Sequence, residues 1–357
     1  MRAAIARAGT LVVDEVAEPE PGDGHALVAV RACGICGSDL HTLRHAHRMV
    51  DVAEATGMGG AFDPDADFVM GHEYVAEVLE LGPATDGVAV RPGDLVVSIP
   101  FLIAGADLVP LGFSNDYPGA YAERMLLTAG ACLPVPNGLD ARRAALTEPM
   151  AVGLHAVNKS GIERGCAAAV VGCGPIGLAI VAWLGARGIE PIVASDLSRR
   201  RRALAVELGA HVVVDPRDEP VFEAWRRVDG MRSLVVYEAV GVPGVLDEVI
   251  FAAPSQARVL VAGVCMEPDT VRPLIAVVKE INLQFAFGYD PAEFADTLRA
   301  IAEGEIDVTP FLTGSVGLDG VAAAFDALAD PEGHVKILVE PGTPPGVTPL
   351  GDTHPAR

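Results

Sequence analysis

Basic residues are scarce in this sequence. Lysine and arginine together number 26 against 48 aspartates and glutamates, which gives a net charge of -22 at pH 7. A chain of this charge repels phosphate backbones and anionic lipid headgroups. We therefore expect neither nucleic acid nor a membrane surface as a partner.

Cysteines are also few and scattered. The six of them lie between residues 33 and 265 of a 357-residue chain. Small disulfide-stapled proteins instead concentrate cysteines in a short, loop-rich chain, so a reducing compartment fits better. The first residues, Met1 to Ile5, lead directly into a strand pattern without a long apolar signal region. We expect a cytoplasmic protein.

One uncharged stretch is long enough for a membrane span. Cys166 to Ala186 is 21 residues long and carries no charge, which meets the length rule for a transmembrane helix. It also holds four glycines and a proline, and it divides into an Ala/Val strand, a glycine turn and a helix. We interpret it as part of a globular domain.

The chain of 357 residues is long enough for two domains, and its 50% apolar residues are enough to give each domain its own core.

Chemically versatile side chains gather in Arg31–His41, whose sequence is Arg-Ala-Cys-Gly-Ile-Cys-Gly-Ser-Asp-Leu-His. A thiolate at Cys36 suits zinc, Ser38 is close enough in sequence to touch whatever the zinc holds, and His41 is able to pass a proton outward. One cysteine cannot hold a metal alone. The best further ligands are His72 with Glu73, and Glu148, each at the edge of an apolar segment.

A second motif is Gly172-Cys173-Gly174-Pro175-Ile176-Gly177. It stands between a strand-like run, Ala167 to Val171, and a helical stretch to about Ala186, and a second strand ends in Asp196, 19 residues after Gly177. This context is typical of a dinucleotide-binding turn, in which glycines admit the pyrophosphate and the acid accepts from a ribose hydroxyl. We expect the cofactor to contact Gly172, Gly174, Pro175, Ile176, Gly177, Asp196 and Arg199.

Four arginines, Arg199 to Arg202, follow Asp196 directly. They form either a solvated helix face or a clamp for the 2'-phosphate of NADP. Asp196 repels such a phosphate, so NAD is the expected cofactor and NADP the alternative. Further strand and helix units follow, with strands at 212–214, 234–239 and 258–264. Strands that alternate with helices predict a parallel, doubly wound sheet.

Taken in order, G-I-C-G-S-D-x-H, G-H-E, E-P-x-x-V-G and the dinucleotide fingerprint resemble the zinc-dependent medium-chain dehydrogenase/reductase family, closest to its polyol and sorbitol dehydrogenase-like branch. The resemblance covers about Met1 to Val339. It implies an α/β protein in which a GroES-like, β-rich catalytic domain is interrupted by a Rossmann domain, with the active site in the cleft between them. It also implies catalytic zinc at Cys36, His72 and Glu148, with Glu73 as a further ligand or a supporting acid.

The resemblance implies roles for other residues. Ser38 and His41 would form a proton relay, and Glu73 would support the metal site.

The predicted domains are 1–155 for the first part of the catalytic domain, 156–293 for the Rossmann domain and 294–340 for the second part of the catalytic domain, with a flexible tail over 341–357. Small-molecule alcohols or ketones are the expected substrates, and a homo-oligomer, either dimer or tetramer, is the expected assembly.

The sequence departs from the family pattern in two places. Relatives commonly carry a lobe of four cysteines that holds a structural zinc, whereas Ile99 to Ala122 has neither Cys nor His, so we expect one zinc per chain. Its apolar residues would pack the lobe or line the substrate pocket. The segment from Thr42 to Phe68 is longer than usual and is interpreted as an enlarged loop over the mouth of the site. A second metal site at His45 and His47 is the alternative to a solvated loop.

Two histidine and cysteine features have plainer interpretations. Cys33 and Cys36 form a C-x-x-C, so a redox pair is conceivable, but the flanking pattern fits the dehydrogenase turn better and leaves Cys33 as a small buried residue. His155 is interpreted as a packing histidine. The expected function is a zinc-dependent dehydrogenase for a secondary alcohol or polyol. The alternatives are an NADPH-preferring carbonyl reductase of the same fold and a non-catalytic nucleotide-binding protein.

Overall fold

The fold is taken from a computed structural model, which describes residues 1–57 and 62–344. The chain forms two compact units. The first contains residues 1–148, 301–303 and the described residues from 311 onward, and the second contains residues 149–300 and 304–310. The predicted domain bounds near 155, 293 and 340 remain predictions. Most of the predicted tail, residues 345–357, lies outside the described residues.

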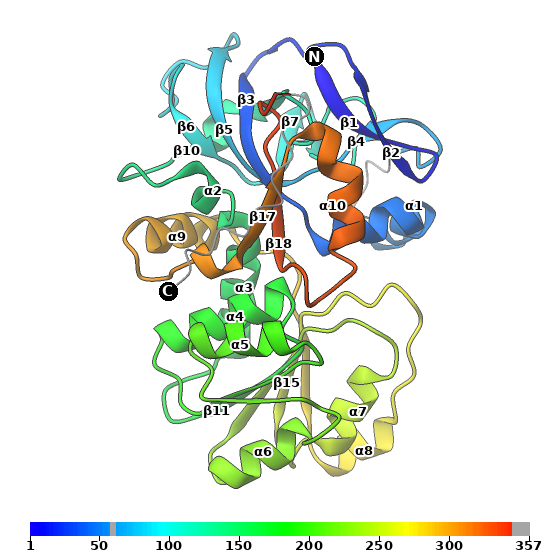
Figure 1. Ribbon diagram of the computed structural model, residues 1–357, viewed down its shortest axis with the longest axis vertical. Helices are drawn as coiled ribbons and strands as arrows, with labels where there is room; N and C mark the ends of the chain where they lie inside the picture. Colours follow the sequence, from blue (N-terminus) through cyan, green and yellow to red (C-terminus); the bar gives the residue numbers. More distant parts are fainter. Residues whose placement is uncertain (58–61, 345–357) are drawn as a thin grey trace. The chain divides into compact units, whose positions relative to one another are not determined.

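The first unit is built on β-sheets (Figure 1). A seven-stranded sheet has the order β10-β6-β5-β3-β18-β17, with β9 also paired to β3, and a three-stranded sheet has the order β2-β1-β4. The strands are β1 (Arg2–Arg7), β2 (Thr10–Glu15), β3 (His25–Gly34), β4 (Phe68–Val69), β5 (Glu73–Leu81), β6 (Leu95–Val97), β9 (Arg124–Thr128), β10 (Leu133–Pro134), β17 (Leu312–Val316) and β18 (Lys336–Val339).

Strand β3 is the centre of this unit, because it pairs antiparallel with β5, β9 and β18. It is an apolar run that is buried along most of its length. The register sets Gly34 of β3 opposite Glu73 of β5 and Leu338 of β18. The end of β3, the start of β5 and strand β18 therefore meet at one place, immediately before Cys36.

The prediction of a loop from Thr42 onward is wrong for its first part. Helix α1 runs over Gly37–Thr56 and has a kink at His45. Apolar side chains at Leu40, Leu43, Ala46 and Val50 pack against the core of the first unit. Their spacing is helical, but polar residues between them hid the period. Of the predicted loop, residues 58–61 lie outside the described part of the chain.

The lobe that lacks cysteine forms a hairpin of β7 (Phe101–Ala104) and β8 (Asp107–Pro110). Leu102 and Leu111 are almost fully buried in the core, whereas Ile103 and Leu108 are 53% and 59% exposed. Apolar packing, one of the two interpretations of this lobe, is therefore confirmed for Leu102 and Leu111.

The second unit is a parallel six-stranded sheet of order β13-β12-β11-β14-β15-β16. Figure 1 shows helices α4 and α5 on one face and α6, α7 and α8 on the other. The strands are β11 (Ala167–Val171), β12 (Ile192–Ser195), β13 (Val212–Val214), β14 (Leu234–Glu238), β15 (Arg258–Val261) and β16 (Asn282–Phe285). The order reverses between β11 and β14, so β11 lies at a topological switch point.

The helices of the second unit follow the predicted alternation. They are α4 (Pro175–Ala186), α5 (Arg199–Glu207), α6 (Val221–Val228), α7 (Val245–Ala252), α8 (Pro273–Val278) and α9 (Pro291–Ala302). Helix α3 (Thr147–Ser160) begins in the first unit and continues into the second, while α2 (Ala141–Ala144) and α10 (Val321–Ala327) belong to the first. The predicted α/β fold, with a GroES-like part and a Rossmann part, is confirmed.

The uncharged stretch from Cys166 to Ala186 divides into β11, a turn and the 12-residue helix α4, as expected. Helix α4 is buried over most of its length because its neighbours are the sheet and α5. Among the described residues, none of the helices combines the length and the apolar character that crossing a bilayer requires.

Candidate metal and cofactor sites

Three potential metal ligands meet at the end of β3 and the start of β5. One ligand atom from each of Cys36, His72 and Glu73 lies within 4.8 Å of the other two. His72 and Glu73 are buried and Cys36 is half-buried. Thiolate, imidazole and carboxylate together are a donor set that suits zinc.

Asp39 orients the imidazole of His72. Its Oδ1 lies 3.3 Å from His72 Nδ1, and both atoms are buried without a hydrogen bond of good geometry. Its Oδ2 accepts hydrogen bonds from Cys36 N at 2.9 Å and from the hydroxyl of Tyr121 at 2.7 Å. A carboxylate behind a histidine fixes which ring nitrogen faces the metal, as in many zinc sites. Sequence reasoning missed Asp39, although it stands inside the quoted motif.

Asp39 and His72 each shift the pKa of the other. Burial by itself raises the pKa of Asp39, but the nearby charge of His72 and the hydrogen bonds from Cys36 N and the Tyr121 hydroxyl outweigh it and lower the pKa. Burial by itself lowers the pKa of His72, but Asp39 and Cys36 outweigh it and raise the pKa well above its usual range. Asp39 and Cys36 therefore favour positive charge at the His72 ring.

Glu73 is paired with a lysine that the sequence did not reveal. Lys336 Nζ donates to both carboxylate oxygens of Glu73, at 2.8 and 2.6 Å, and to the carbonyl of Ile35 at 3.0 Å. Lys336 and Glu73 are 1% and 0% exposed. Lys336 lies in a predicted strand, but only the pairing of β18 with β3 brings it to Glu73, so no local signal could have identified it.

Glu148 lies in the first turn of α3. It is not in the cluster of Cys36, His72 and Glu73, but its charge raises the pKa of both Lys336 and Tyr74. In the same unit, Glu148 is therefore an electrostatic neighbour of the Lys336 ammonium. Its role as a direct zinc ligand stays a prediction.

Ser38 and His41, the two residues predicted to form a proton relay, lie on the first turns of α1. Ser38 Oγ is 3.3 Å from His72 Nε2, the nitrogen on the opposite side of the ring from Asp39. His41 is exposed, and partial burial together with the charges of His45 and Arg44 lowers its pKa. Ser38 thus lies beside a candidate metal ligand and His41 is exposed, while the relay itself stays a prediction.

An aromatic side chain borders the same cluster. The ring of Phe113 is 5.5 Å from the imidazole of His72 and 6.4 Å from the ring of Phe62. His47, by contrast, is exposed and lies 3.3 Å from Asp65. In the described ranges 1–57 and 62–344, neither His45 nor His47 belongs to a cluster of three potential ligands.

His155 belongs to a separate polar cluster in the second unit. Glu293 accepts from His155 Nδ1 at 2.8 Å, from Asn158 Nδ2 at 2.6 Å and from the backbone N–H of Asp290 at 2.9 Å. Glu293 thus joins α3 to the start of α9. Its ligand atoms lie near those of His155 and Asp290, but this hydrogen bonding accounts for the arrangement without a metal.

The dinucleotide fingerprint connects β11 to α4. Gly172 has φ +91°, and a Cβ at Gly177 would lie 1.9 Å from the carbonyl oxygen of Gly172, so both positions require glycine. A Cβ at Gly174 would meet no atom within 4 Å, which leaves room for a ligand beside the turn. Pro175 and Ile176 open α4 behind Gly174. The turn therefore fits a pyrophosphate at the helix start.

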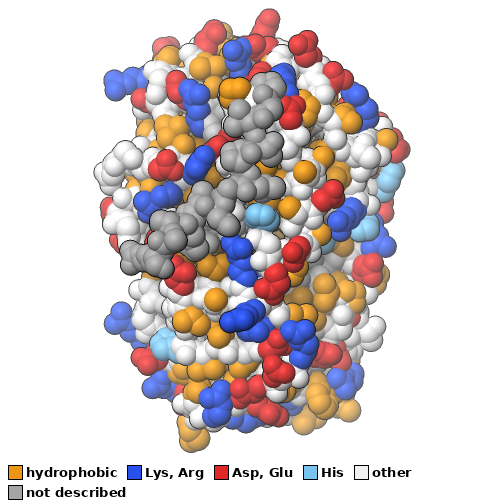
Figure 2. Space-filling view, in the orientation of Figure 1, with side chains coloured by type: hydrophobic (Ala, Val, Ile, Leu, Met, Phe, Trp, Pro, Cys, Tyr) orange, Lys and Arg blue, Asp and Glu red, His pale blue; other side chains and the backbone are white. Residues whose placement is uncertain are grey.

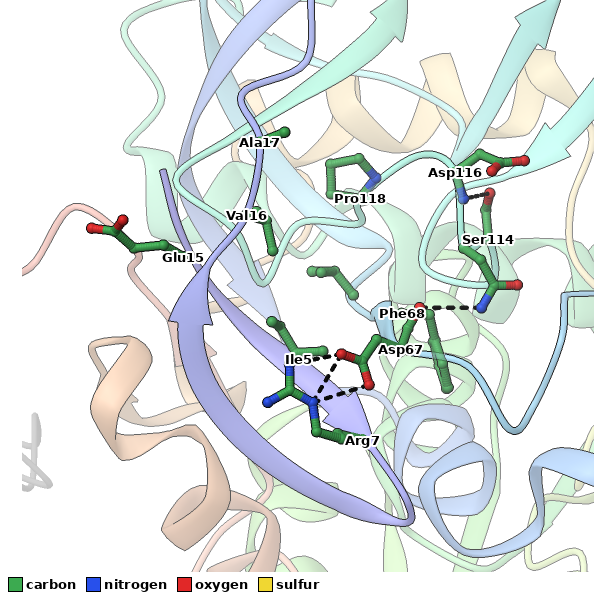
Figure 3. Close-up of a pocket in the computed structure, with 12 residues that line it drawn as sticks. Ile5, Arg7, Glu15, Val16, Ala17, Asp67, Phe68, Ser114, Asp116 and Pro118 are labelled. Carbon is green, nitrogen blue, oxygen red and sulfur yellow. Dashed lines mark hydrogen bonds and ion pairs between the residues drawn. The ribbon is translucent and has the colours of Figure 1, made fainter.

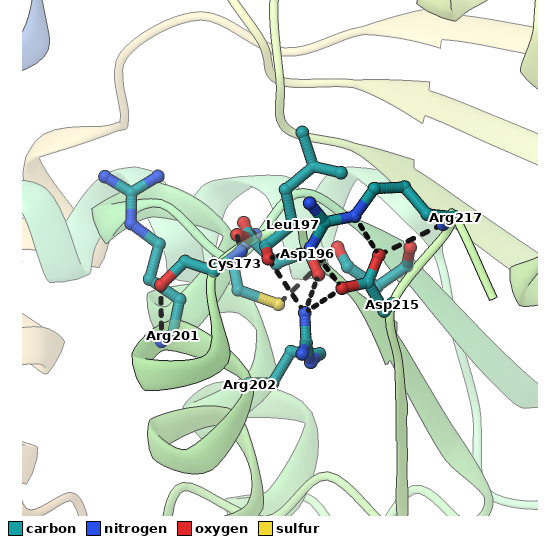
Figure 4. A network of polar contacts seen from close by, with 9 residues as sticks. Cys173, Asp196, Leu197, Arg201, Arg202, Asp215 and Arg217 are labelled. Atoms are coloured by element: carbon teal, nitrogen blue, oxygen red, sulfur yellow. Dashed lines mark hydrogen bonds and ion pairs between the residues drawn. The ribbon is translucent and has the colours of Figure 1, made fainter. Parts of the chain in front are cut away.

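Asp196 follows β12 and faces this turn. Its carboxylate accepts from Cys173 N and from Ser198 N, both at 2.7 Å. Arg199 is an exposed residue in the first turn of α5. Arg202 instead turns back, and its Nη1 donates to the carbonyl oxygens of Asp196 and Leu197 (Figure 4). The four arginines therefore do not act as one solvated face.

A cavity of about 340 Å³ opens elsewhere on the first unit (Figure 3). It is lined by β1, the 67–69 segment and the 114–118 loop, and Arg7 Nε crosses it to Asp67 Oδ2 at 2.8 Å. Its described lining residues include none of the predicted site residues. Figure 2 shows acidic and basic side chains interspersed over one face of the molecule, not a basic patch.

Two family models match the chain. Residues 22–137 match the alcohol dehydrogenase GroES-like domain, and residues 175–303 match the zinc-binding dehydrogenase domain. The chain belongs to the zinc-dependent medium-chain dehydrogenase/reductase family, in its polyol dehydrogenase-like branch.

Its relatives narrow the class. The chain is 32% identical to (R,R)-butanediol dehydrogenase of Bacillus subtilis, over 92% of this chain and 96% of the relative. It is 28% identical to human sorbitol dehydrogenase, over 93% of each chain. These matches identify an NAD(P)-dependent oxidoreductase of alcohols or polyols.

Solved structures agree with this class. The crystal structure of 2R,3R-butanediol dehydrogenase from Bacillus subtilis superposes with a TM-score of 0.81 at 30% identity and covers 96% of this chain and 99% of that one. A zinc-binding dehydrogenase from Sinorhizobium meliloti, bound to NADP, gives a TM-score of 0.80 at 29% identity, with 95% and 99% coverage. The relatives therefore do not decide between NAD and NADP.

Proposed function

We propose that this enzyme oxidises a secondary alcohol or polyol to its ketone with NAD, at a single zinc per chain. The observation that carries the proposal is the cluster of Cys36, His72 and Glu73 with Asp39 behind the imidazole. An orphaned buried His72 Nδ1 facing a carboxylate fits a histidine whose other nitrogen binds a metal.

Cys36, His72 and Glu148 would hold the zinc, with water or Glu73 completing its sphere. Both oxygens of Glu73 are engaged by Lys336, which favours a supporting role for Glu73. Zinc bound here supplies Lewis-acid polarisation of the substrate oxygen. Metal analysis after exhaustive dialysis tests the proposal. We expect one zinc in the wild type, none in Cys36→Ser, and weaker binding in Glu148→Gln than in Glu73→Gln. Two tightly bound zincs per chain would contradict it.

Ser38 would accept the proton of the alcohol and pass it toward His41. Its hydroxyl lies beside His72 Nε2, and His41 is exposed. The lowered pKa of His41 keeps its imidazole neutral near pH 7, so the ring is able to accept a proton and release it to water. A bound nicotinamide accepts the hydride.

NAD is the proposed cofactor because of Asp196. At an effective dielectric of about 20, a like-charge pair at ~4 Å costs on the order of 4 kcal/mol per unit charge. Arginines near Asp196 offset part of this cost. The ratio of kcat/KM for NAD and NADP tests the assignment, and a preference for NADP would favour the alternative, an NADPH-dependent carbonyl reductase. The NADP-bound relative keeps that alternative open.

A substrate of moderate size, with an apolar part next to the reacting carbon, is proposed. The proposal of a polyol rests on the butanediol and sorbitol dehydrogenase relatives. The proposal of an apolar part of the substrate rests on Phe113, whose ring borders His72. An apolar wall gains about 25 cal/mol for each Å² of ligand surface that it covers, but an unpaired sugar hydroxyl costs about 1 to 3 kcal/mol.

Steady-state rates on four alcohols test the substrate class. We expect activity on 2,3-butanediol and cyclohexanol, and weaker activity on sorbitol. Activity confined to 1-hexanol, the primary alcohol, would overturn the proposal. Zinc-free enzyme is the control.

A homo-oligomer, dimer or tetramer, is also proposed. All four residues of the edge strand β16 are exposed, Phe285 at 60%, and on the neighbouring helix α8 Leu274 and Val278 are each 73% exposed. Among the described residues β16 is the last strand of its sheet, and exposed apolar groups beside a sheet edge favour association. Light scattering on the wild type and Phe285→Glu tests this, and a monomeric wild type would contradict it.

A cytoplasmic location is proposed as well, and the six free thiols support it.

A further inference from the structure

Asp215, which directly follows β13, pairs with two arginines near the dinucleotide fingerprint. Asp215 Oδ2 accepts from Arg202 Nη1 at 3.0 Å and from Arg217 Nη2 at 2.5 Å, and its Oδ1 accepts from Arg217 Nε at 2.8 Å. The Asp215 side chain is only 9% exposed. Arg217 is thus held by a bidentate pair, and Arg202 by a single one (Figure 4).

Both arginines also touch the backbone that carries Asp196. Arg202 Nη1 donates to the carbonyl oxygens of Asp196 and Leu197, at 2.7 and 2.9 Å, and Arg217 Nη2 donates to that of Leu197 at 3.2 Å. Two positive charges therefore lie beside the loop that would face the adenosine ribose. Guanidinium groups are the usual partners of phosphate because their paired donors match its oxygens.

We propose that Asp215 is a specificity-determining residue that sets the preference for NAD by neutralising Arg202 and Arg217 and holding them away from a 2'-phosphate. With Asp215 in place, both guanidinium groups are paired with its carboxylate, which offsets part of their charge and fixes their position. Removing the charge of Asp215 leaves Arg202 and Arg217 without the carboxylate that pairs with both of them. This inference rests on the proposed NAD-dependent function, and it assigns Asp215 a role through the arginines, without contact to the cofactor.

Binding of two adenosine fragments tests the proposal without turnover. Isothermal titration calorimetry gives dissociation constants for 5'-AMP and for adenosine 2',5'-bisphosphate with the full-length wild type and with Asp215→Asn. We expect the wild type to favour 5'-AMP, and Asp215→Asn to shift the ratio of the two constants at least about tenfold toward the bisphosphate, since freed guanidinium groups gain charge-assisted hydrogen bonds. Affinity for 5'-AMP should change little.

Two further variants separate this role from a purely structural one. Asp247→Asn removes an acid from another bidentate arginine pair of the same unit, with Arg272 Nε at 2.9 Å, and changes the net charge equally. It should leave the ratio unchanged. Asp215→Asn combined with Arg202→Ala and Arg217→Ala should lose the gain.

Each result has a separate meaning. If Asp215→Asn weakens both fragments equally, or shifts the ratio no more than Asp247→Asn, the inference is wrong while the proposed function stands. If the wild type binds neither fragment, the nucleotide site in the proposed function fails. If the wild type already favours the bisphosphate, both the NAD assignment and the inference are overturned.

Discussion

Lys336 Nζ donates to both carboxylate oxygens of Glu73 inside the first unit, where the two residues are almost fully buried. Burial by itself lowers the pKa of Lys336, but the charge of Glu73 outweighs it and raises the pKa. The Lys336 side chain therefore keeps its positive charge despite its burial. Its pair with Glu73 connects β18 with β5, the strand that begins at Glu73 directly after His72.

Replacing Lys336 with methionine should destabilise the protein strongly. The change leaves the Glu73 carboxylate buried without its cation, which typically costs about 3 to 5 kcal/mol. Chemical denaturation measures the loss. Arg142→Met is the control, because Arg142 pairs with Glu340 at the surface with 46% of its side chain exposed, and such pairs contribute about 0 to 1 kcal/mol. Equal losses in the two variants would contradict the structural role of Lys336.

Gly34→Ala should also be poorly tolerated, for a steric reason. A Cβ at Gly34 would lie 2.0 Å from Glu73 Oε2, so the carboxylate would have to leave Lys336. We expect Gly34→Ala to lower the free energy of unfolding by about 1 to 3 kcal/mol, the usual cost of overpacking a core. A Cβ at Gly37, in the first turn of α1, would meet no atom within 4 Å. Gly37→Ala should therefore be neutral or stabilising, and a comparable loss in it would refute the steric account.

His41→Ala should slow turnover modestly and alter its pH dependence. Partial burial, His45 and Arg44 lower the pKa of His41, so the ring is neutral and able to accept a proton until the pH falls through that lowered pKa. A relay end that water can replace should contribute no more than about 10²-fold, the low end for general acid-base groups. The pH profile of kcat measures this. An unchanged rate together with an unchanged profile would contradict the relay.

Glu293→Gln should reduce stability at neutral pH and have a smaller effect in acid. Burial by itself raises the pKa of Glu293, but the amide of Asp290, Asn158 and His155 lower it. The pKa of Glu293 is lower in the folded state than in the unfolded state. The stabilisation that its carboxylate provides is therefore present above the unfolded-state pKa of about 4.3, and it is lost as the pH falls through the folded-state pKa. We expect a loss of about 1 to 3 kcal/mol at pH 7. A loss that stays constant down to pH 3 would contradict this.

Local sequence patterns predicted most of the second unit. Strand, glycine turn and helix at 167–186 carry their own signals, and Gly172 and Gly177 are glycines for the steric reasons expected. Helix α1 was missed because its apolar residues are sparse and it faces a β-rich core with one side only. Edge strand β16 was missed because an exposed strand lacks the buried apolar run of its neighbours.

The candidate site was only partly predictable. Cys36, His72 and Glu73 were identified from motifs and do lie together. Lys336 was not, because it is 263 residues from Glu73 in sequence and meets it only through the pairing of β18 with β3 and of β3 with β5. Asp39 resembles an ordinary helix-start residue in sequence, and its position behind His72 depends on how the chain enters β5.

The transfer of deuterium from a labelled alcohol to the cofactor tests the account most directly. Zinc-loaded enzyme is incubated with NAD and cyclohexanol deuterated at the carbinol carbon, and the reduced nicotinamide is examined by NMR. The account predicts that the deuterium appears at C4 of the nicotinamide ring, and that Cys36→Ser yields no reduced cofactor. Reduced cofactor without the label, with the deuterium in water, would contradict hydride transfer from a secondary carbon.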